Sequence, residues 1–230
     1  MRISVCIPCM NRTHDLRQVM PSLIAAANNS SPVEIAVLDY NSQDDLAEFI
    51  LETQRADGLG SCELSYRRYT GRDYYHMAHA GNLSALASSG DYVLLTGADI
   101  FMQPTYLQVV GQELEKGYTW LHHSGGYRYV GVICVSRQEF MEAGGYDERF
   151  EFYGKSDKDL FARLHRRGAP HAEIPALLSL IPTPWDEKLK NYRLPLSRSQ
   201  ARKRSKPIYL QNIEEGVLVA NEGKEWGSWE

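Results

Sequence analysis

Short apolar runs alternate with helix-forming segments through the first half of the chain, and this alternation constrains the fold most strongly. Residues 3–7, 33–38, 62–66 and 91–95 have the length and apolar content of buried strands, and residues 76–88 form a small-residue segment typical of a helix. Between the first two runs, apolar residues recur at the spacing of one helix face: Leu16, Val19, Met20, Leu23 and Ile24. Because the connections are short, the sequence predicts an α/β fold with a mostly parallel central sheet and helices on both faces.

The second half of the chain is less regular. Residues 118–121 and 130–135 are strand candidates around a glycine-rich turn, and the pattern from Ser136 to Glu139 is typical of a capping box that opens a short helix. Asp157 is placed to begin another helix. Without an internal repeat or linker before Arg193, a single compact domain is expected, followed by a C-terminal extension that is either wrapped on it or mobile.

Charge is distributed unevenly along the 230 residues, although the net charge is only −4. Residues 193–206 contain six basic residues and no acid, whereas residues 207–230 contain five Glu and one Lys, so the body before them is acidic. The basic stretch could contact an anionic partner such as nucleic acid, or it could be a solvated surface segment.

Composition limits the class of protein. With 43% hydrophobic and 23% charged residues the chain is an ordinary globular one. The four cysteines do not form a disulfide framework, which favours a cytoplasmic location, with peripheral association with a membrane left open. No apolar run approaches the roughly 20 residues of a transmembrane helix. The N-terminus enters a strand directly, so no signal peptide is expected.

Polar side chains follow three of the expected strands. Asn11 and Arg12 follow the first, Asp39 the second and Asp99 the fourth. Parallel strands deliver such groups to one sheet edge, where ligands of α/β proteins bind. A carboxylate there can be a turn former, or it can hold a divalent cation that neutralises a diphosphate. Arg12 can bind a phosphate or a base carbonyl through two of its guanidinium N–H groups.

Asp157 has two interpretations. It can simply cap a helix, a contribution of about 1 kcal/mol. At a helix start that faces a cleft, it can also be a general base toward a hydroxyl group, kept ionised by the positive end of the helix.

Cysteine and histidine pairs are weaker candidates. Cys6 and Cys9 have the spacing of a redox or zinc motif, but they lie on and just after a buried strand, which favours core packing. The pairs His76 with His79, and His122 with His123, lack a third ligand, so a structural role is favoured over metal binding for both.

Four motifs in the first half resemble those of GT-A glycosyltransferases of family 2. Residues 7–16 (IPCMNRTHDL) are similar to the family's opening P-F-R-N-R-x-x-H-L, and residues 39–42 (DYNS) to its D-x-x-S turn. Residues 80–82 (AGN) resemble its R-N-x-G helix, and residues 96–99 (TGAD) occupy the place of D-x-D.

The most specific stretch lies in the second half, within residues 129–168. Residues 144–150 (GGYDERF) and 153–160 (YGKSDKDL) are similar to G-G-F-D-E-x-F and W-G-G-E-D-D-D-L, a segment that resembles the galactosyltransferase-like C-terminal part of such enzymes. The resemblance covers residues 3 to about 185. It implies a catalytic domain over residues 1–192, with a nucleotide-binding half to about residue 100 and an acceptor half after it; residues 193–230 form a basic, then acidic extension.

The resemblance also implies roles for individual residues. Asp157 aligns with the catalytic base of an inverting transfer, in which a sugar moves from a nucleotide diphosphate sugar, with UDP favoured, to an acceptor hydroxyl of a saccharide. Asp99 aligns with the ligand of Mn²⁺ or Mg²⁺. The remaining implied binding residues are Pro8, Asn11, Arg12 and Asp39 for the nucleotide, Asn82 on the helix before the metal strand, and Tyr153, Gly154 and Asp159 on the acceptor side.

The chain departs from the family pattern at the expected metal site. Gly97 replaces the first Asp of D-x-D, Ser156 replaces the Glu beside the base, and Lys155 adds a positive charge. The metal-binding His that usually follows the base helix is absent from residues 178–185. Either a metal persists with the substrate diphosphate as ligand, which is the favoured interpretation, or basic side chains such as Lys155 replace it.

Two alternative functions remain open at this point. The same chemistry could act on a modified base in DNA or RNA, gripped by residues 193–206 and by tyrosines. The departures could instead mark a nucleotide-sugar-binding module without catalytic activity.

Overall fold

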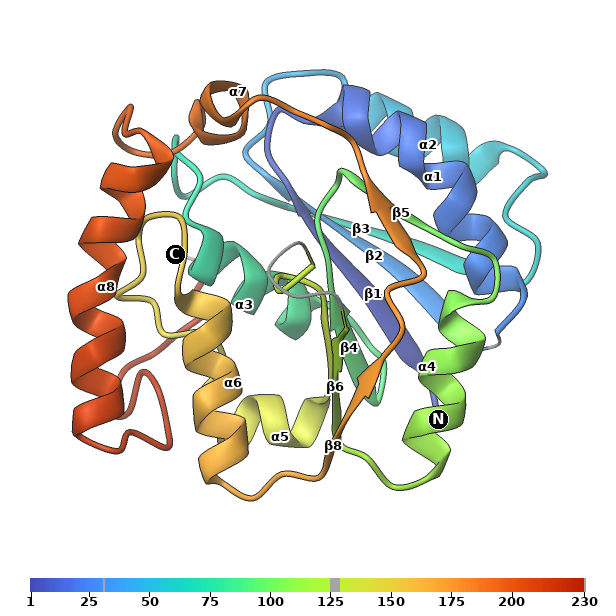
Figure 1. Cartoon of the computed structure of the whole chain (residues 1–230). Helices are drawn as coiled ribbons and strands as arrows, with labels where there is room; N and C mark the ends of the chain where they lie inside the picture. The colour runs from blue at the N-terminus through green and yellow to red at the C-terminus, as the bar shows by residue number, and fades with distance from the viewer. Residues whose placement is uncertain (31, 125–128, 230) are drawn as a thin grey trace.

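A mostly parallel sheet forms the centre of the computed structural model, which describes residues 1–30, 32–124 and 129–229 (Figure 1). In these residues the sheet has seven strands in the order β3-β2-β1-β4-β7-β6-β8, and β7 alone runs antiparallel to its neighbours. The predicted α/β class is therefore confirmed. The strands are β1 (Ile3–Cys9), β2 (Val33–Tyr40), β3 (Glu63–Tyr69), β4 (Tyr92–Leu95), β6 (Trp120–His123), β7 (Ile133–Ser136) and β8 (His171–Ile174).

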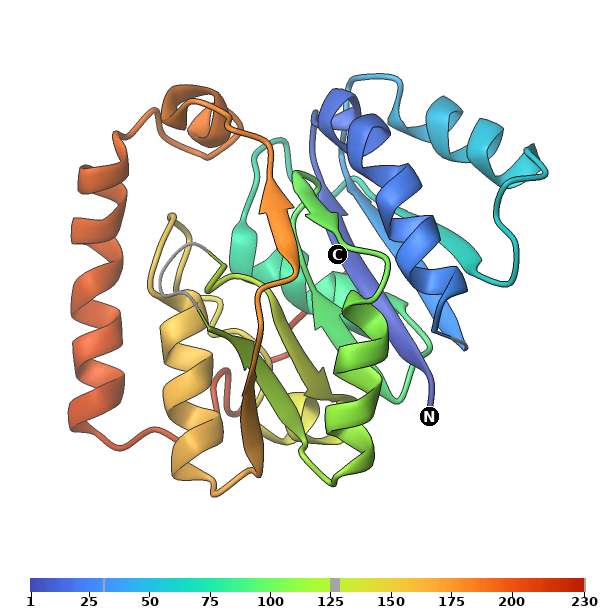
Figure 2. The ribbon, with the colours of Figure 1, turned by 45° about the vertical axis from the view of Figure 1, so that its right-hand side comes forward.

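Helices cover both faces of this sheet (Figure 2). Alternate side chains of β1 enter opposite cores: Val5 packs in the core that contains Leu16, and Cys6 in the core that contains Ala78. The first core lies under α1 (Thr13–Asn28), α2 (Leu46–Arg55) and α4 (Tyr106–Glu115), and the second under α3 (Met77–Ala87), α5 (Arg137–Glu142) and α6 (Ser156–Arg166). The expected helices all form, with starts that differ by a few residues.

A small antiparallel sheet lies beside the main one and was not expected from the sequence. It pairs β5 (Ile100–Met102), directly after Asp99, with β9 (Leu178–Leu180). The chain then forms α7 (Trp185–Leu189), near the carboxyl ends of β1 and β2 (Figure 1). Hydrogen bonds hold the segment after α7 against the N-terminal half: the Asn191 side chain donates to the Met10 carbonyl, and Tyr75 N–H donates to the Asn191 carbonyl.

The C-terminal extension folds onto the domain, where Ile208, Tyr209 and Trp226 pack against the second core. Its main element is α8 (Arg198–Glu214), a helix that begins with a capping box between Ser197 and Gln200 and lies along α6 (Figure 1). The chain then returns to the end of α5, where Ala220 N–H donates to the Ala143 carbonyl. A Cβ at Gly144, whose φ is +71°, would collide with the backbone of this returning segment. Among the described residues, no helix is long and apolar enough to cross a membrane.

Candidate active site

A cleft opens at the carboxyl ends of β1 and β4, and the described residues divide it into two adjoining compartments. The cationic compartment, of about 450 Å³, is lined by Arg12, Lys188 and Arg198. The carboxylate compartment, of about 230 Å³, is lined by Asp157 and Tyr146. The two share a wall whose members include Pro8, Gly97, Asp99, Tyr153 and Lys188. The cleft thus collects side chains from both halves of the chain.

Asp99 lies in the shared wall, immediately after the turn that follows β4. Its Oδ2 accepts a hydrogen bond of 2.7 Å from Lys188 Nζ and lies 3.7 Å from Nη2 of Arg12. Arg12 also contacts the Asp15 carboxylate and donates to Thr183 Oγ1 at 3.3 Å. Asp99 is therefore paired with two cations of this chain.

Asp157 lies in the first turn of α6 and faces the carboxylate compartment. Burial raises its pKa to about 6, although Tyr146 Oη donates a hydrogen bond of 3.4 Å to Oδ1 that opposes the rise. Burial likewise raises the pKa of Tyr146 well above its usual value, so the phenol remains a donor. A carboxyl with a pKa near 6 is ionised at neutral pH and still basic enough to accept a proton from a hydroxyl group.

The turn before α6 sets the position of Asp157. Gly154 and Lys155 both have positive φ, at +99° and +79°. A Cβ at Gly154 would approach Arg202 Cγ on α8 to 3.0 Å, so the turn fits closely against that helix. Tyr153 lines both compartments, and its ring packs against Trp185 with centroids 5.0 Å apart.

Asn11 ends the loop after β1 and ties it to neighbouring segments. Its φ of +53° is one that Asn tolerates better than most residues. Its side chain accepts from Gln43 N–H at 2.7 Å and donates to Asn191 Oδ1 at 3.1 Å. Asn11 lies outside the lining of the two compartments, in a shallow depression that Asn191 also lines.

Asp39 is buried at the end of β2, where groups of this chain already satisfy its carboxylate. Oδ1 accepts from Ser42 N–H at 2.7 Å, which closes the expected turn, and Oδ2 accepts from Tyr66 Oη at 2.6 Å. Arg68 Nε lies 3.6 Å from Oδ2. Asp39 does not line either compartment as the described residues define them.

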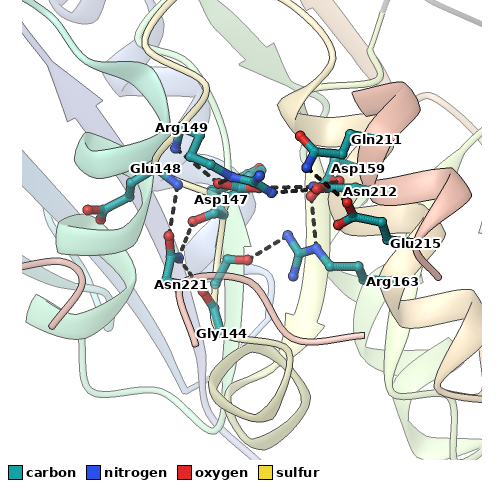
Figure 3. Close-up of polar contacts among 12 residues, drawn as sticks. Gly144, Asp147, Glu148, Arg149, Asp159, Arg163, Gln211, Asn212, Glu215 and Asn221 are labelled. Atoms are coloured by element: carbon teal, nitrogen blue, oxygen red, sulfur yellow. Dashed lines mark hydrogen bonds and ion pairs between the residues drawn. The ribbon is translucent and has the colours of Figure 1, made fainter. Parts of the chain in front are cut away.

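Asn82 and Asp159 are also fully buried and serve the packing beside the cleft. Asn82 on α3 accepts from Tyr146 N–H and donates to the carbonyl of the same residue, so it holds the turn that carries Tyr146. Asp159 accepts from Arg163 Nε at 2.8 Å and from Asn212 Nδ2 at 2.7 Å. Figure 3 shows the contacts of Asp159, Arg163 and Asn212 in a network that joins α6, α8 and the turn after α5.

Several cleft residues were not anticipated from the sequence, among them Tyr146, Trp185, Lys188 and Arg198. The guanidinium of Arg198 stacks 4.0 Å above the Trp185 ring. Lys188 lies three residues after Trp185, just beyond the segment that lacks the family's His. A cation at this point of the sequence is the signal that could have indicated it.

The paired cysteines are buried, and His76, His79 and His123 form hydrogen bonds within the chain. Burial raises the pKa of the Cys6 thiol to about 12 and that of Cys9 further. His76 caps α3, and burial lowers its pKa to about 4. His79 contacts Tyr40 Oη, and His123 contacts Tyr106 Oη. Both imidazoles are thus tied to buried phenols.

The described residues fit a divalent metal ion poorly. Among them, no group of three or more His, Cys, Asp or Glu side chains is arranged to hold one. Mg²⁺ and Mn²⁺ prefer several oxygen ligands, and Asp99, the carboxylate at the family's metal position, is engaged by Lys188. Of the ligands that a metal ion would need here, the structure supplies only Asp99 among the described residues, and Lys188 already pairs with it.

Comparison with known proteins decides the family. The model of glycosyl transferase family 2 matches residues 4–161. The chain belongs to this family. The model describes family 2 as a whole, so the resemblance of residues 129–168 to a galactosyltransferase-like segment stays a prediction. None of the curated proteins matches the chain significantly.

Three solved structures share the fold at low sequence identity. The first 349 residues of TarS from S. aureus match with a TM-score of 0.60 at 13% identity, over 76% of this chain and 58% of that one. The mannosyltransferase PcManGT from Pyrobaculum calidifontis, solved with GDP-Man and Mn²⁺, gives 0.61 at 16%, over 76% and 55%. Glucosyl-3-phosphoglycerate synthase from Mycobacterium tuberculosis, solved with Mn²⁺, UDP and phosphoglyceric acid, gives 0.56 at 17%, over 81% and 73%.

These likenesses show a GT-A fold. This chain spans little more than half the length of the TarS fragment and of PcManGT.

Proposed function

We propose that the protein transfers a sugar from a nucleoside diphosphate sugar to an acceptor hydroxyl, with inversion at the anomeric carbon and Asp157 as the general base. The observation that carries the proposal is that one cleft has a carboxylate in one compartment and several cations in the next. Asp157, with its pKa raised to about 6, faces one compartment, and cationic side chains line the adjoining one.

The acceptor would enter the carboxylate compartment. Its oxygen would form a bond to the anomeric carbon while the bond from that carbon to the diphosphate breaks, and its proton would pass to Asp157. Gly131 leaves room beside this carboxylate, because even a Cβ there would stay 3.9 Å from both Asp157 oxygens. Tyr146 would orient the carboxylate through its hydroxyl group.

The departing nucleoside diphosphate would occupy the cationic compartment, where Lys188 and Arg12 can stabilise its growing negative charge. Pro8 and Asp99, in the shared wall, would border the reacting bond. Although Mn²⁺ or Mg²⁺ was favoured from the sequence, no step is assigned to a metal, because the described donor set fits one poorly. Asn11 and Asp39 would support the nucleotide side through the loops that they hold together.

UDP-sugars are proposed as the first donors to test, since TarS was solved with UDP-GlcNAc and the phosphoglycerate synthase with UDP. A saccharide hydroxyl is the proposed acceptor. A nucleic-acid acceptor has less support, because several residues of the basic stretch contact this chain itself: Arg198 stacks on Trp185, and Arg204 on Phe152.

The decisive experiment is a donor screen in which release of nucleoside diphosphate is measured with and without saccharide acceptors. The proposal expects at least one donor to be turned over, and expects Asp157→Asn to lower that turnover by about 10²- to 10⁴-fold while retaining donor binding. Binding of donors without any hydrolysis or transfer by the wild-type protein would instead support a non-catalytic binding module.

A further inference from the structure

Asp99 and Lys188 form a close ion pair in the shared wall of the cleft. The Lys188 Nζ to Asp99 Oδ2 distance is 2.7 Å, and the two side chains are 22% and 16% exposed. Arg12 adds a second positive charge 3.7 Å from the same oxygen. A divalent cation at Asp99 would have to displace the ammonium group and would then lie close to two like charges.

Gly97 is part of the same arrangement. A Cβ at this position would lie 2.7 Å from Asp99 Oδ1, closer than real contacts allow. The carboxylate of Asp99 is therefore folded over the position where the family has its first Asp, and a side chain at residue 97 would force it to move. The glycine at residue 97 thus leaves the space in which Asp99 can adopt the conformation that pairs with Lys188.

The charges that line the cationic compartment match a nucleoside diphosphate. Among its described lining residues, Arg12, Lys188 and Arg198 outnumber the single carboxylate of Asp99, while Asp15, which is not part of the lining, also pairs with Arg12. Arg198 is held over Trp185, and its buried Nε has no hydrogen-bond partner in the described part of the chain. An anionic ligand in this compartment could supply that partner.

We infer that Lys188, with Arg12 and Arg198, neutralises the nucleoside diphosphate in the place where related enzymes use a divalent metal ion. The inference rests on the proposed function, because it assumes that the ligand is a nucleoside diphosphate. Asp99 is then a positioning residue: it holds the ammonium group of Lys188 at the shared wall, from which that group can reach a phosphate oxygen without leaving the cleft.

Calorimetric titration with UDP, in excess EDTA and again with Mn²⁺, tests the inference, and GDP, ADP, CDP and TDP serve as alternatives if UDP does not bind. Wild-type protein should bind a diphosphate in EDTA, with an affinity that Mn²⁺ changes by less than about threefold. Lys188→Met should weaken that binding by about 10- to 100-fold, as expected for loss of a charge-assisted hydrogen bond. Lys116→Met is the matched control, since Lys116 forms a 2.7 Å pair with Glu113 far from the cleft lining.

The possible outcomes separate the inference from the proposed function. Binding that requires Mn²⁺ would overturn the inference and leave the proposed function standing. Binding of no nucleoside diphosphate under either condition would overturn both. Equal affinities of wild type and Lys188→Met would also overturn the inference. If Lys188→Met does not fold, the Mn²⁺ dependence of the wild-type protein and the affinity of Lys188→Arg, expected within about fivefold of wild type, decide it.

Discussion

The two compartments of the cleft share a wall and yet have opposite chemistry. Segments after residue 180 and the loop after β1 supply the three cations of the cationic compartment, Arg12, Lys188 and Arg198. The carboxylate compartment is lined by α3, the end of β4, residues 129–132 and the start of α6, and it presents Asp157 beside Tyr146. Under the proposed function, the cationic compartment would hold the leaving group and the carboxylate compartment would accept the proton.

Asp157→Asn tests the carboxylate compartment and should have the largest effect. Transfer should fall by about 10²- to 10⁴-fold, because the amide cannot accept the proton of the acceptor. Initial rates with saturating donor and acceptor measure this. Near-native turnover would remove Asp157 from the proposed role, and Glu142→Gln, at an exposed site on α5, is a control that should keep the wild-type rate.

Substitution of Asp159, two residues further along α6, should lower the stability of the protein, because this residue belongs to a buried network. It pairs with Arg163, and both side chains are almost fully buried, at 1% and 0% exposed. Asp159→Asn would leave a buried guanidinium without its charge partner and should lower the free energy of unfolding by about 3 to 5 kcal/mol. Chemical denaturation measures the loss. An unchanged midpoint would show that the network in Figure 3 contributes little to stability.

The raised pKa of Asp157 should also appear as pH-dependent stability. A carboxyl has a pKa near 4 when unfolded, and burial raises that of Asp157 to about 6, so the folded state binds the proton more tightly. This stabilisation is complete below about pH 4 and is lost as pH rises through about 6. Relative to Asp157→Asn, the wild-type protein should therefore lose roughly 1 to 3 kcal/mol between these values. Parallel stability curves across this range would contradict the raised pKa.

The mildest effect concerns the rim of the cationic compartment. Arg198→Gln removes one of its positive charges and the stacking on Trp185. Affinity for UDP should fall by about 5- to 10-fold, and the difference from wild type should shrink as salt rises, because screening weakens the interaction that was lost. Titrations at two salt concentrations measure this. A change that does not depend on salt would assign Arg198 a packing role instead.

Much of the fold could be predicted because apolar periodicity dominates its core. Alternation of strands and helices indicated the parallel sheet, and all expected helices are present. Helix α8 was missed because its sequence has no regular apolar stripe: Ile208 and Tyr209 pack against the core, and polar contacts of Asn212 supply much of the remaining attachment. Its capping box, Ser197 with Gln200, was a readable signal.

The site was predictable to a different extent. Motif resemblance brought out Asp157 and Asp99, which do lie in one cleft. The same resemblance placed Asp159 on the acceptor side, yet an arginine four residues later, Arg163, was a signal for an ion pair on the helix. Motif matching could not indicate Lys188 as a cleft residue, because it lies in a segment where the chain departs from the family pattern.

The most direct test is one calorimetric comparison of UDP binding, in excess EDTA, by wild-type protein, Asp157→Asn and Lys188→Met. If the compartments divide the work as described, Asp157→Asn should bind UDP at least as tightly as wild type, because a nearby negative charge is lost, whereas Lys188→Met should bind about 10- to 100-fold more weakly. Equal weakening by both variants, or weakening by Asp157→Asn alone, would contradict the division between the two compartments.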